Sequence, residues 1–232
     1  MHTLKKILAI IPARGGSKSI LKKNIKPFSG KPLIFYAINA AQKSKYIDKI
    51  VVSTDDDEIS RCARRYHVDV IKRPPKLAQD KTPMDLVLTH AVNFLEKEKN
   101  YSPYAVVLLQ PTSPLRRTQH IDEAIKKFLR EKVDSLVSVE FFHNHRHEVD
   151  SNRRLIPAFT KIANRDKRPP IVMENGALYI SNTTLIKQGK IRGNRIGFYV
   201  MDHYSSIDID EPIDFVVAEH LMRALRRRIS VR

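Results

Sequence analysis

The stretch from residue 7 to residue 24, ILAIIPARGGSKSILKKN, places an apolar run directly before two glycines and several cationic side chains. An uninterrupted apolar run is typical of a strand that is covered on both faces, as in a parallel sheet. The glycines let backbone amides approach an anion, and Arg14, Lys18, Lys22 and Lys23 can supply charge to phosphate oxygens. Neither the Walker A spacing nor the dinucleotide-binding spacing is present. A phosphate loop of another kind and a tight turn with solvated lysines are therefore both open.

The rest of the chain repeats this alternation of short apolar runs and segments with helical periodicity. Helical spacing is clear around Leu86, Val87, Ala91 and Leu95, around Ile121, Ile125, Phe128 and Leu129, and from about Glu211 to Arg228. Alternating strands and helices predict one α/β domain over residues 1–232, a three-layer α/β/α Rossmann-like sandwich around a mostly parallel sheet. The further strands are expected at residues 49–54, 68–72, 104–110, 135–139, 176–181 and 195–201.

Residues 143–172 break the pattern, because they are polar, basic and proline-containing and show little periodicity. A structureless loop of that length is unusual inside a compact domain, so we interpret the segment as an arm or lid that leaves the sheet. His143, His145 and His147 alternate within it. Metal ligation by these histidines and plain solvation on an extended strand are both open, although no cysteine or carboxylate completes a site.

The composition indicates an anionic partner in a reducing compartment. The chain has 42 Lys and Arg against 25 Asp and Glu, a formal charge of +17, which favours nucleic acid, acidic lipid or small phosphorylated and carboxylated substrates. Without an aromatic platform or a recognisable reading helix, nucleic-acid binding is a remote alternative. Cys62 is the single cysteine and is expected to be a packed core thiol. No apolar run approaches the roughly 18 residues of a membrane span, so we expect a cytoplasmic protein without a membrane partner.

Four loops that follow apolar runs contain chemically reactive side chains: ARGGSKSILKKN, STDDDE, QPTSPLRR and SIDIDE. In an open parallel sheet such loops gather at the carboxyl ends of the strands, where ligands bind. Asp208 and Asp210 flank Ile209, so an extended backbone would place both carboxylates on one face, where they could share a hard divalent cation such as Mg²⁺. The alternative is that Asp210 caps the last helix, with Pro212 at an early helical position.

These motifs together resemble a known family. IPARGGSK, Lys23-Asn24, VSTDD, LAQD, LLQPTSPLR, ENGALYI and SIDID occur in the order and approximate spacing of the N-acylneuraminate cytidylyltransferases, or CMP-sialic acid synthetases. Within this family, the sequence most resembles the bacterial and archaeal branch that activates sialic, legionaminic or pseudaminic acids. It covers nearly the whole chain, and the combination of the three longest motifs is highly specific.

The resemblance implies a reaction in which the anomeric hydroxyl of a nine-carbon 2-keto sugar acid attacks the α-phosphorus of CTP and pyrophosphate leaves. It also implies a homodimer with Mg²⁺, in which the arm at 143–172 contributes to the sugar site of the partner. The rival enzyme is a cytidylyltransferase for the eight-carbon acid Kdo. Carried over by position, the catalytic residues would be Arg14, Lys23, Asp208 and Asp210, the last two binding the metal. The nucleotide would contact Arg14, Gly15, Gly16, Ser17, Lys23, Asn24, Arg73 and Thr82, and the sugar would contact Gln110, Arg116, Arg165 and Tyr179.

The chain departs from the family pattern in two places. The family usually has Gly and Pro where this chain has Ser19 and Leu21. Serine adopts a positive φ less easily than glycine, so we expect a stiffer or differently shaped phosphate loop. The arm reads HNHRH, and Asp166 follows Arg165 where the family usually has Gln. These differences concern the identity of the sugar acid and leave the nucleotide half unchanged.

Overall fold

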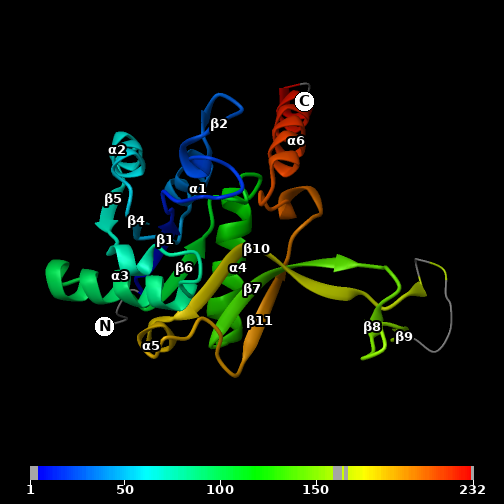
Figure 1. The fold of residues 1–232 in the computed structure, drawn as a ribbon. Coiled ribbons are helices and arrows are strands. Elements are labelled where there is room, and N and C mark those ends of the chain that lie inside the picture. Colours follow the sequence, from blue (N-terminus) through cyan, green and yellow to red (C-terminus); the bar gives the residue numbers. More distant parts are fainter. Residues whose placement is uncertain (1–4, 159–163, 165–166, 231–232) are drawn as a thin grey trace.

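The computed structural model describes residues 5–158, 164 and 167–230, and its centre is a seven-stranded sheet (Figure 1). Along the sheet the strands follow the order β11-β7-β10-β6-β1-β4-β5, and all neighbours are parallel except where β10 pairs with β6 and β7. This confirms the predicted mostly parallel sheet. The strands are β1 (Ile7–Pro12), β4 (Lys49–Thr54), β5 (Asp69–Lys72), β6 (Ala105–Leu109), β7 (Ser135–Phe142), β10 (Ile171–Asn182) and β11 (Ile196–Val200).

Helices cover both faces of the sheet, which confirms the three layers. On β1, Ile7, Ala9 and Ile11 pack into a core with α1 (Leu33–Gln42), α2 (Asp57–Arg65) and α4 (Thr118–Glu131). The alternate residues Leu8 and Ile10 pack into a second core with α3 (Met84–Lys99) and α5 (Thr183–Lys187). The predicted core thiol Cys62 is 1% exposed in the first of these cores. None of the helices in the described ranges is long and apolar enough to cross a membrane.

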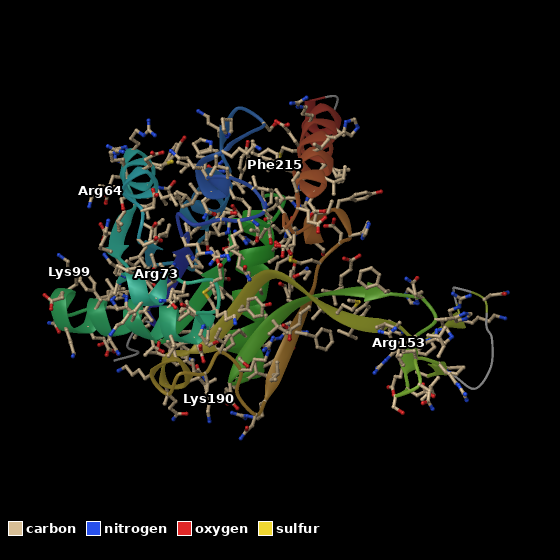
Figure 2. All side chains as sticks on the ribbon, viewed as in Figure 1. Arg64, Arg73, Lys99, Arg153, Lys190 and Phe215 are labelled. Atoms are coloured by element: carbon tan, nitrogen blue, oxygen red, sulfur yellow. The ribbon has the colours of Figure 1, made fainter. Side chains whose placement is uncertain are left out.

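A third, smaller apolar cluster attaches α6 (Pro212–Ser230) to the rest of the domain (Figure 2). The ring of Phe28 lies 5.3 Å from that of Phe215 and 5.2 Å from that of Tyr36, both edge to face. Phe28 belongs to a two-stranded hairpin formed by β2 (Pro27–Phe28) and β3 (Lys31–Pro32). Ile20 and Ile209 complete the cluster, so it joins the segment after β1 to the SIDID segment. Three short helices within the described ranges are η1 (Lys23–Ile25), η2 (Pro75–Leu77) and η4 (Tyr204–Ser206).

The arm projects from the domain as an extension of β7 and β10 (Figure 1). These strands run further than the sequence indicated, because β7 ends at Phe142 and β10 already begins at Ile171. Beyond them β8 (His147–Val149) and β9 (Leu155–Pro157) form a separate antiparallel hairpin. Arg153, with φ at 62°, lies in its turn (Figure 2). Among the described residues no group of three or more His, Cys, Asp or Glu is arranged for a metal, so the three alternating histidines do not form such a site there.

The predicted helical faces are confirmed with one exception. Val87, Ala91 and Leu95 of α3 are buried, but Leu86 is 46% exposed and Leu88 takes its place in the core. The helical spacing admitted both leucines, and only the position of α3 against the sheet distinguishes them. In α4, Ile121, Ile125 and Phe128 are buried as predicted, and Leu129 is partly buried against the same core.

His120 contributes to the start of α4 as a neutral side chain. It is 4% exposed, and its Nδ1 accepts the backbone N–H of Arg117 at 3.2 Å. Burial, and next the Arg117 charge, lower the pKa of His120 to about 4. The unfolded chain, with an ordinary histidine pKa near 6.5, therefore binds this proton more readily. Stability from His120 is present above that value and is lost as the pH falls toward 4.

We predict that the free energy of unfolding falls by on the order of 2 kcal/mol from His120 alone between pH 6.5 and 4.5. His120→Gln keeps an acceptor but cannot titrate, so its stability should depend less on pH over that interval. Denaturant titrations of both proteins at the two pH values measure the difference. Equal pH dependence in the two proteins would contradict the assignment.

Candidate active site

The loops that follow the parallel strands meet at one edge of the sheet and enclose a cavity of about 380 Å³. We call it the basic cavity, because three cationic side chains of the segment after β1, Arg14, Lys18 and Lys23, line it together with Arg73. Its other lining residues are Pro12, Ser17, Ser19, Asn24, Met84, Gln110, Pro111, Thr112 and Asp210. Four positive side chains around a space of this size suit a polyanion.

A second cavity of about 540 Å³ adjoins the first, and Gln110 lines both. We call it the bulge cavity, because the register of β10 against β7 shifts between Glu174 and Tyr179. Within the bulge Gly176 has φ at +71°, and a Cβ there would lie 3.4 Å from Asp208 Oδ2. A bulge re-aims side chains at the edge of a sheet. The lining residues are Gln110, Glu140, Phe142, Met173, Glu174, Asn175, Gly176, Tyr179, Ser206 and Asp208.

Hydrogen bonds within the protein hold the bulge in place. Ser138 Oγ donates to Asn175 Oδ1 at 2.6 Å and accepts the backbone N–H of Leu178 at 2.8 Å. Asn175 Nδ2 donates in turn to Ser206 Oγ at 2.9 Å. The bulge is therefore fixed to β7 on one side and to Ser206, the first residue of SIDID, on the other.

The segment after β1 turns at Lys22, which has φ at 51°, whereas Ser19 is not among the residues with a positive φ. Lys22 Nζ donates to both carboxylate oxygens of Glu58 on α2, at 2.7 and 2.8 Å. The next residue, Lys23, points the opposite way and donates to the backbone carbonyl of Ile209 at 2.7 Å. Asn24 Nδ2 donates to the Arg14 carbonyl at 2.9 Å and closes the loop on itself.

Gly15 serves the loop in a way that the sequence did not indicate. Its N–H donates to Asp55 Oδ1 at 3.1 Å, so this amide is already engaged within the protein. A Cβ on Gly15 would lie 2.7 Å from Asp56 Oδ2 and 2.9 Å from Asp56 Cβ. Asp56 cannot easily move, because its side chain caps α2 through the N–H of Ile59 at 2.8 Å. Gly16, in contrast, has open space where its Cβ would stand.

Arg73 lies at the base of the basic cavity, 4% exposed. Its Nη2 donates to the Ser53 carbonyl at 2.7 Å and its Nε to the Ser53 hydroxyl at 3.3 Å. Burial lowers the pKa of Arg73 to about 10, while nearby Asp55 raises it. The guanidinium therefore stays charged at neutral pH and adds positive potential below the loop.

The SIDID segment distributes its two aspartates over the two cavities. Ile209 is fully buried, and its N–H donates to the Thr112 carbonyl at 2.8 Å. Asp208 lines the bulge cavity, and its Oδ1 is buried without a hydrogen-bond partner. Burial raises the pKa of Asp208; the neighbouring charge of Asp210 also raises it, whereas the Thr112 hydroxyl and Lys23 lower it. Asp210 lines the basic cavity, with Oδ1 at 3.8 Å from Lys23 Nζ.

The structure contradicts the interpretation of Asp210 as a helix cap. The last helix begins at Pro212, and Asp214 reaches back to the N–H groups of Asp210 and Glu211 at 3.0 and 2.8 Å. Capping is therefore done by Asp214, which leaves the 77% exposed carboxylate of Asp210 available to the cavity.

Arg116 does not line either cavity. Its side chain is 3% exposed and lies behind Gln110, where Nη1 donates to the Gln110 carbonyl at 3.1 Å and also to the Ala177 carbonyl. Burial lowers the pKa of Arg116 to about 9, and nearby Asp208 raises it. The contacts indicate a residue that positions Gln110 and the bulge rather than one that touches a ligand directly.

The structure thus brings most of the predicted site residues together. Those that line a cavity are Arg14, Ser17, Lys23, Asn24, Arg73, Gln110, Tyr179, Asp208 and Asp210. Gly15, Gly16, Thr82 and Arg116 do not line these cavities, and Thr82 Oγ1 bonds the Lys76 carbonyl at 3.4 Å instead. Arg165 lies outside the described residues. Sequence reasoning missed Asp55 and Asp80, although both belong to motifs it had noted, STDDDE and LAQD.

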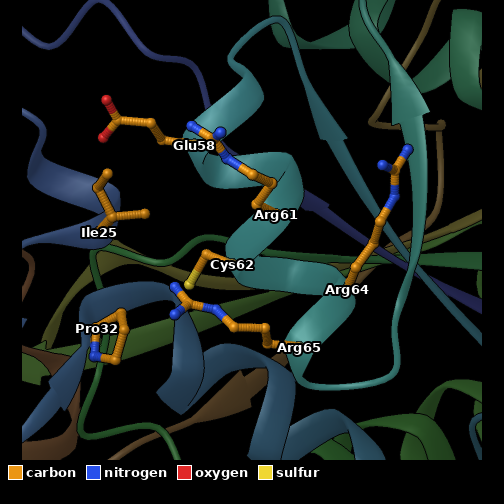
Figure 3. A pocket seen from close by; sticks show the side chains of 7 residues that line it. All are labelled: Ile25, Pro32, Glu58, Arg61, Cys62, Arg64 and Arg65. Atoms are coloured by element: carbon orange, nitrogen blue, oxygen red, sulfur yellow. The ribbon is translucent and has the colours of Figure 1, made fainter.

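A further cavity of about 710 Å³ lies elsewhere, between η1 and α2 (Figure 3). Arg61 and Arg65 point from α2 toward the side of Ile25 and Pro32, whereas Arg64 points away from them (Figure 3). The cavity contains none of the predicted site residues. The helix η1 separates this cavity from the basic cavity: Ile25 of η1 lines the former, and Lys23 of η1 lines the latter.

A family model described as "Cytidylyltransferase" matches residues 8–228, which include every loop around the two cavities. The chain belongs to the cytidylyltransferase family. The matched region contains all the residues that line the basic cavity and the bulge cavity, so the family match includes the candidate site as well as the fold.

Curated relatives of this cytidylyltransferase-family chain have a consistent name. The chain is 34% identical over 229 residues to the N-acylneuraminate cytidylyltransferase of Escherichia coli, and the alignment covers 96% of this chain and 54% of that protein. It is 35% identical over 227 residues to N-acylneuraminate cytidylyltransferase A of Danio rerio, covering 95% and 51%. For the Streptococcus agalactiae serotype V protein of the same name the values are 33%, 93% and 53%. The chain spans about half the length of these relatives.

Solved structures share the fold at low sequence identity. One described as CMP:2-keto-3-deoxy-manno-octonic acid synthetase complexed with CTP has a TM-score of 0.71 at 13% identity, covering 94% of this chain and 99% of that chain. One described as 4-diphosphocytidyl-2C-methyl-D-erythritol synthase from Anaerococcus prevotii has a TM-score of 0.68 at 15% identity, covering 94% and 96%. These likenesses show that the chain shares the fold of these proteins.

The different surroundings of the two glycines give a testable prediction. Gly15→Ala should lower the free energy of unfolding by about 1–3 kcal/mol, because the new methyl group collides with the capping side chain of Asp56. Gly16→Ala should change it by less than about 0.5 kcal/mol, because its Cβ points into open space. Chemical denaturation measures both. Equal losses of stability in the two variants would contradict the assignment of the Gly15 effect to contact with Asp56.

Proposed function

We propose that this protein is a cytidylyltransferase that transfers CMP from CTP to the anomeric hydroxyl of a nine-carbon nonulosonic acid and releases pyrophosphate. The observation that supports it most is the pair of adjoining cavities that share Gln110, one lined by cations and the other by hydrogen-bonding groups. This is the division that a reaction between a nucleoside triphosphate and a sugar requires. The names of the curated relatives support the same substrates.

In the basic cavity Arg14, Lys18 and Lys23 would bind the triphosphate, with Arg73 below them. Nucleotidyl transfer depends more on positioning and charge stabilisation than on covalent chemistry, so fixed cations lower the barrier as charge moves onto pyrophosphate. Lys23 is the best positioned of them. Its ammonium is held by the Ile209 carbonyl, only 13% of its side chain is exposed, and it therefore loses little freedom on binding.

Asp208 and Asp210 line different cavities, so the Mg²⁺ ion that we propose they share would lie where the two cavities adjoin. Magnesium usually takes one or two protein carboxylates and completes its shell with water and substrate phosphates. Asp208 Oδ1 is buried without a partner, and Asp210 faces the triphosphate cavity from the same extended segment. When bound, the metal would lower the pKa of the attacking hydroxyl and neutralise phosphate charge, so no separate histidine base is needed.

In the bulge cavity Gln110, Glu140, Glu174 and Asn175 can accept or donate hydrogen bonds to hydroxyl and N-acyl groups. Tyr179 lines the wall below them, and burial raises its pKa to about 12, so its phenol keeps a proton to donate. The described lining of this cavity includes no lysine or arginine. The carboxylate of the sugar acid would therefore need a cation from elsewhere, and we propose Arg165 of the arm, as the resemblance implies.

The test of the proposed function is pyrophosphate release with CTP, Mg²⁺ and a panel of sialic, legionaminic, pseudaminic and Kdo acids. Turnover with at least one nine-carbon acid is expected, and turnover with Kdo alone would transfer the assignment to the rival enzyme. Thermal shift adds an independent readout, since CTP with Mg²⁺ should stabilise the protein by mass action whereas random oligonucleotides at physiological salt should not. The single buried thiol agrees with a reducing compartment, so we propose the cytoplasm as the location.

We predict that Asp208→Asn and Asp210→Asn each lower turnover by about a hundredfold or more and leave the melting temperature nearly unchanged. Asparagine keeps the shape of the side chain but loses the charge that a hard cation needs. Asp214→Asn is the matched control, because it removes a charge at the same helix start and still caps. Near wild-type turnover in either of the first two variants would remove that residue from the site. Chelation of the wild type by EDTA should reproduce the loss, and added Mg²⁺ should reverse it.

We also propose that two copies of the chain associate through the arm. Val149 and Leu155 lie directly opposite each other on β8 and β9, and each is 66% exposed. An isolated two-stranded hairpin is at best marginally stable in water, so exposed apolar side chains on this one favour a covering partner. Val172 and Met173, both 53% exposed where β10 enters the arm, are further exposed apolar side chains, and Met173 also lines the bulge cavity.

For this interface we predict a dimeric mass by light scattering and a monomeric mass for the double variant Val149→Lys, Leu155→Lys. The monomer should keep its CTP affinity and lose affinity for the sugar acid, because the basic cavity lies within one chain. As a control, Ile213→Lys places a charge on another exposed apolar position, 62% exposed on α6, and should leave the dimer intact. A fully active wild-type monomer would exclude the arm interface.

A further inference from the structure

Asp80 joins the segment after β5 to the cations of the basic cavity. Its Oδ1 accepts from Arg14 Nη1 at 2.5 Å, and its Oδ2 is paired with Lys18 Nζ. Each carboxylate oxygen therefore holds one cation. Arg14 and Lys18 both line the basic cavity, whereas Asp80 does not. The Asp80 carboxylate therefore binds these two cations from the rim of the cavity.

The position of Asp80 in the chain explains how it reaches that rim. Arg73 and Met84 line the basic cavity, and the segment between them passes along its edge through η2. Lys18, and then Arg14, lower the pKa of Asp80, so it is ionised at neutral pH. Within the described part of the chain, Arg14 and Lys18 are the ion-pair partners of Asp80.

These two ion pairs are weak enough to be exchanged. The side chains of Arg14, Lys18 and Asp80 are 33%, 82% and 37% exposed, and exposed pairs of this kind are screened by salt and by water. A triphosphate offers several charged oxygens to the same two cations and competes well with one carboxylate. Orthophosphate has fewer charges and fewer oxygens, so it has less to gain by displacing Asp80.

We propose that Asp80 sets the anion affinity of the basic cavity: it holds Arg14 and Lys18 until an anion displaces it, so that a triphosphate still binds whereas anions of lower intrinsic affinity stay mostly unbound. This proposal rests on the proposed function, since CTP is the triphosphate concerned. Asp80 acts through the two cations and does not touch the reacting atoms. Its removal should therefore change anion affinity and the KM for CTP more than kcat.

The experiment is calorimetric binding of inorganic tripolyphosphate and of orthophosphate at low salt, without cytosine or sugar. Asp80→Asn should bind tripolyphosphate at least about threefold more tightly than the wild type, because the carboxylate no longer has to be displaced, and the gain for orthophosphate should be equal or smaller, since it takes fewer of the cations. Both gains should shrink as salt is added. Asp69→Asn is the matched control. It removes one charge and the exposed ion pair with Lys49, but at the amino end of β5, the opposite edge of the sheet.

Weaker tripolyphosphate binding by Asp80→Asn would overturn the proposal and make Asp80 a residue that positions the cations productively. An equal gain in Asp69→Asn would overturn it as a net-charge effect, and so would a wild type that binds no tripolyphosphate. Asp80→Ser, checked by its melting temperature, tests the same point with a shorter side chain. If the polyphosphate results hold while CTP and every acid of the panel give no pyrophosphate, the proposed function fails and the effect of Asp80 on anion affinity stands.

Discussion

The arrangement of the site depends on the burial of one apolar residue, Ile209. Its side chain is fully buried beside Ile20 in the cluster that holds α6, its N–H bonds the Thr112 carbonyl, and its carbonyl receives Lys23 Nζ. Complete burial of such a side chain contributes about 1.5–3 kcal/mol, and both backbone groups are satisfied at the same time. Three loops that are distant in sequence are thereby fixed at one point. Because Ile209 is fixed, Asp208 on one side of it is directed to the bulge cavity and Asp210 on the other side to the basic cavity.

Acidic side chains hold the cationic loop in place. Asp55 engages the amide of Gly15, Asp56 fills the space beside it, and Glu58 binds Lys22 from α2. These carboxylates all come from the segment after β4, the strand parallel to β1, so the pairing of two strands also pairs an acidic loop with a basic one. A loop so restrained keeps its charges oriented before any ligand arrives, which is the condition for electrostatic stabilisation without reorganisation.

The two cavities differ in whether one chain supplies the cations that the proposed ligand needs. The basic cavity has cations from the segment after β1 and from Arg73, all within one chain. The bulge cavity has carboxylates and amides, and its described lining has no cation, although the proposed substrate is an acid. The arm that begins beside it exposes an apolar pair at its far hairpin. These observations are consistent with a nucleotide half that is complete in each subunit and a sugar half that is completed by association.

The sequence by itself determined the seven strands, the mostly parallel sheet and the four loops that form the site, because continuous apolar runs and loop chemistry are local properties. It could not distinguish Leu86 from Leu88, since both fit a helical face. Nor could it identify the role of Gly15, which depends on Asp56 in the loop between β4 and α2. Only the tertiary structure placed Arg116 behind Gln110 and brought Asp80 to Arg14, 66 residues away. Such contacts follow from strand order and packing, which bring distant loops to one edge of the sheet and have no counterpart in local spacing.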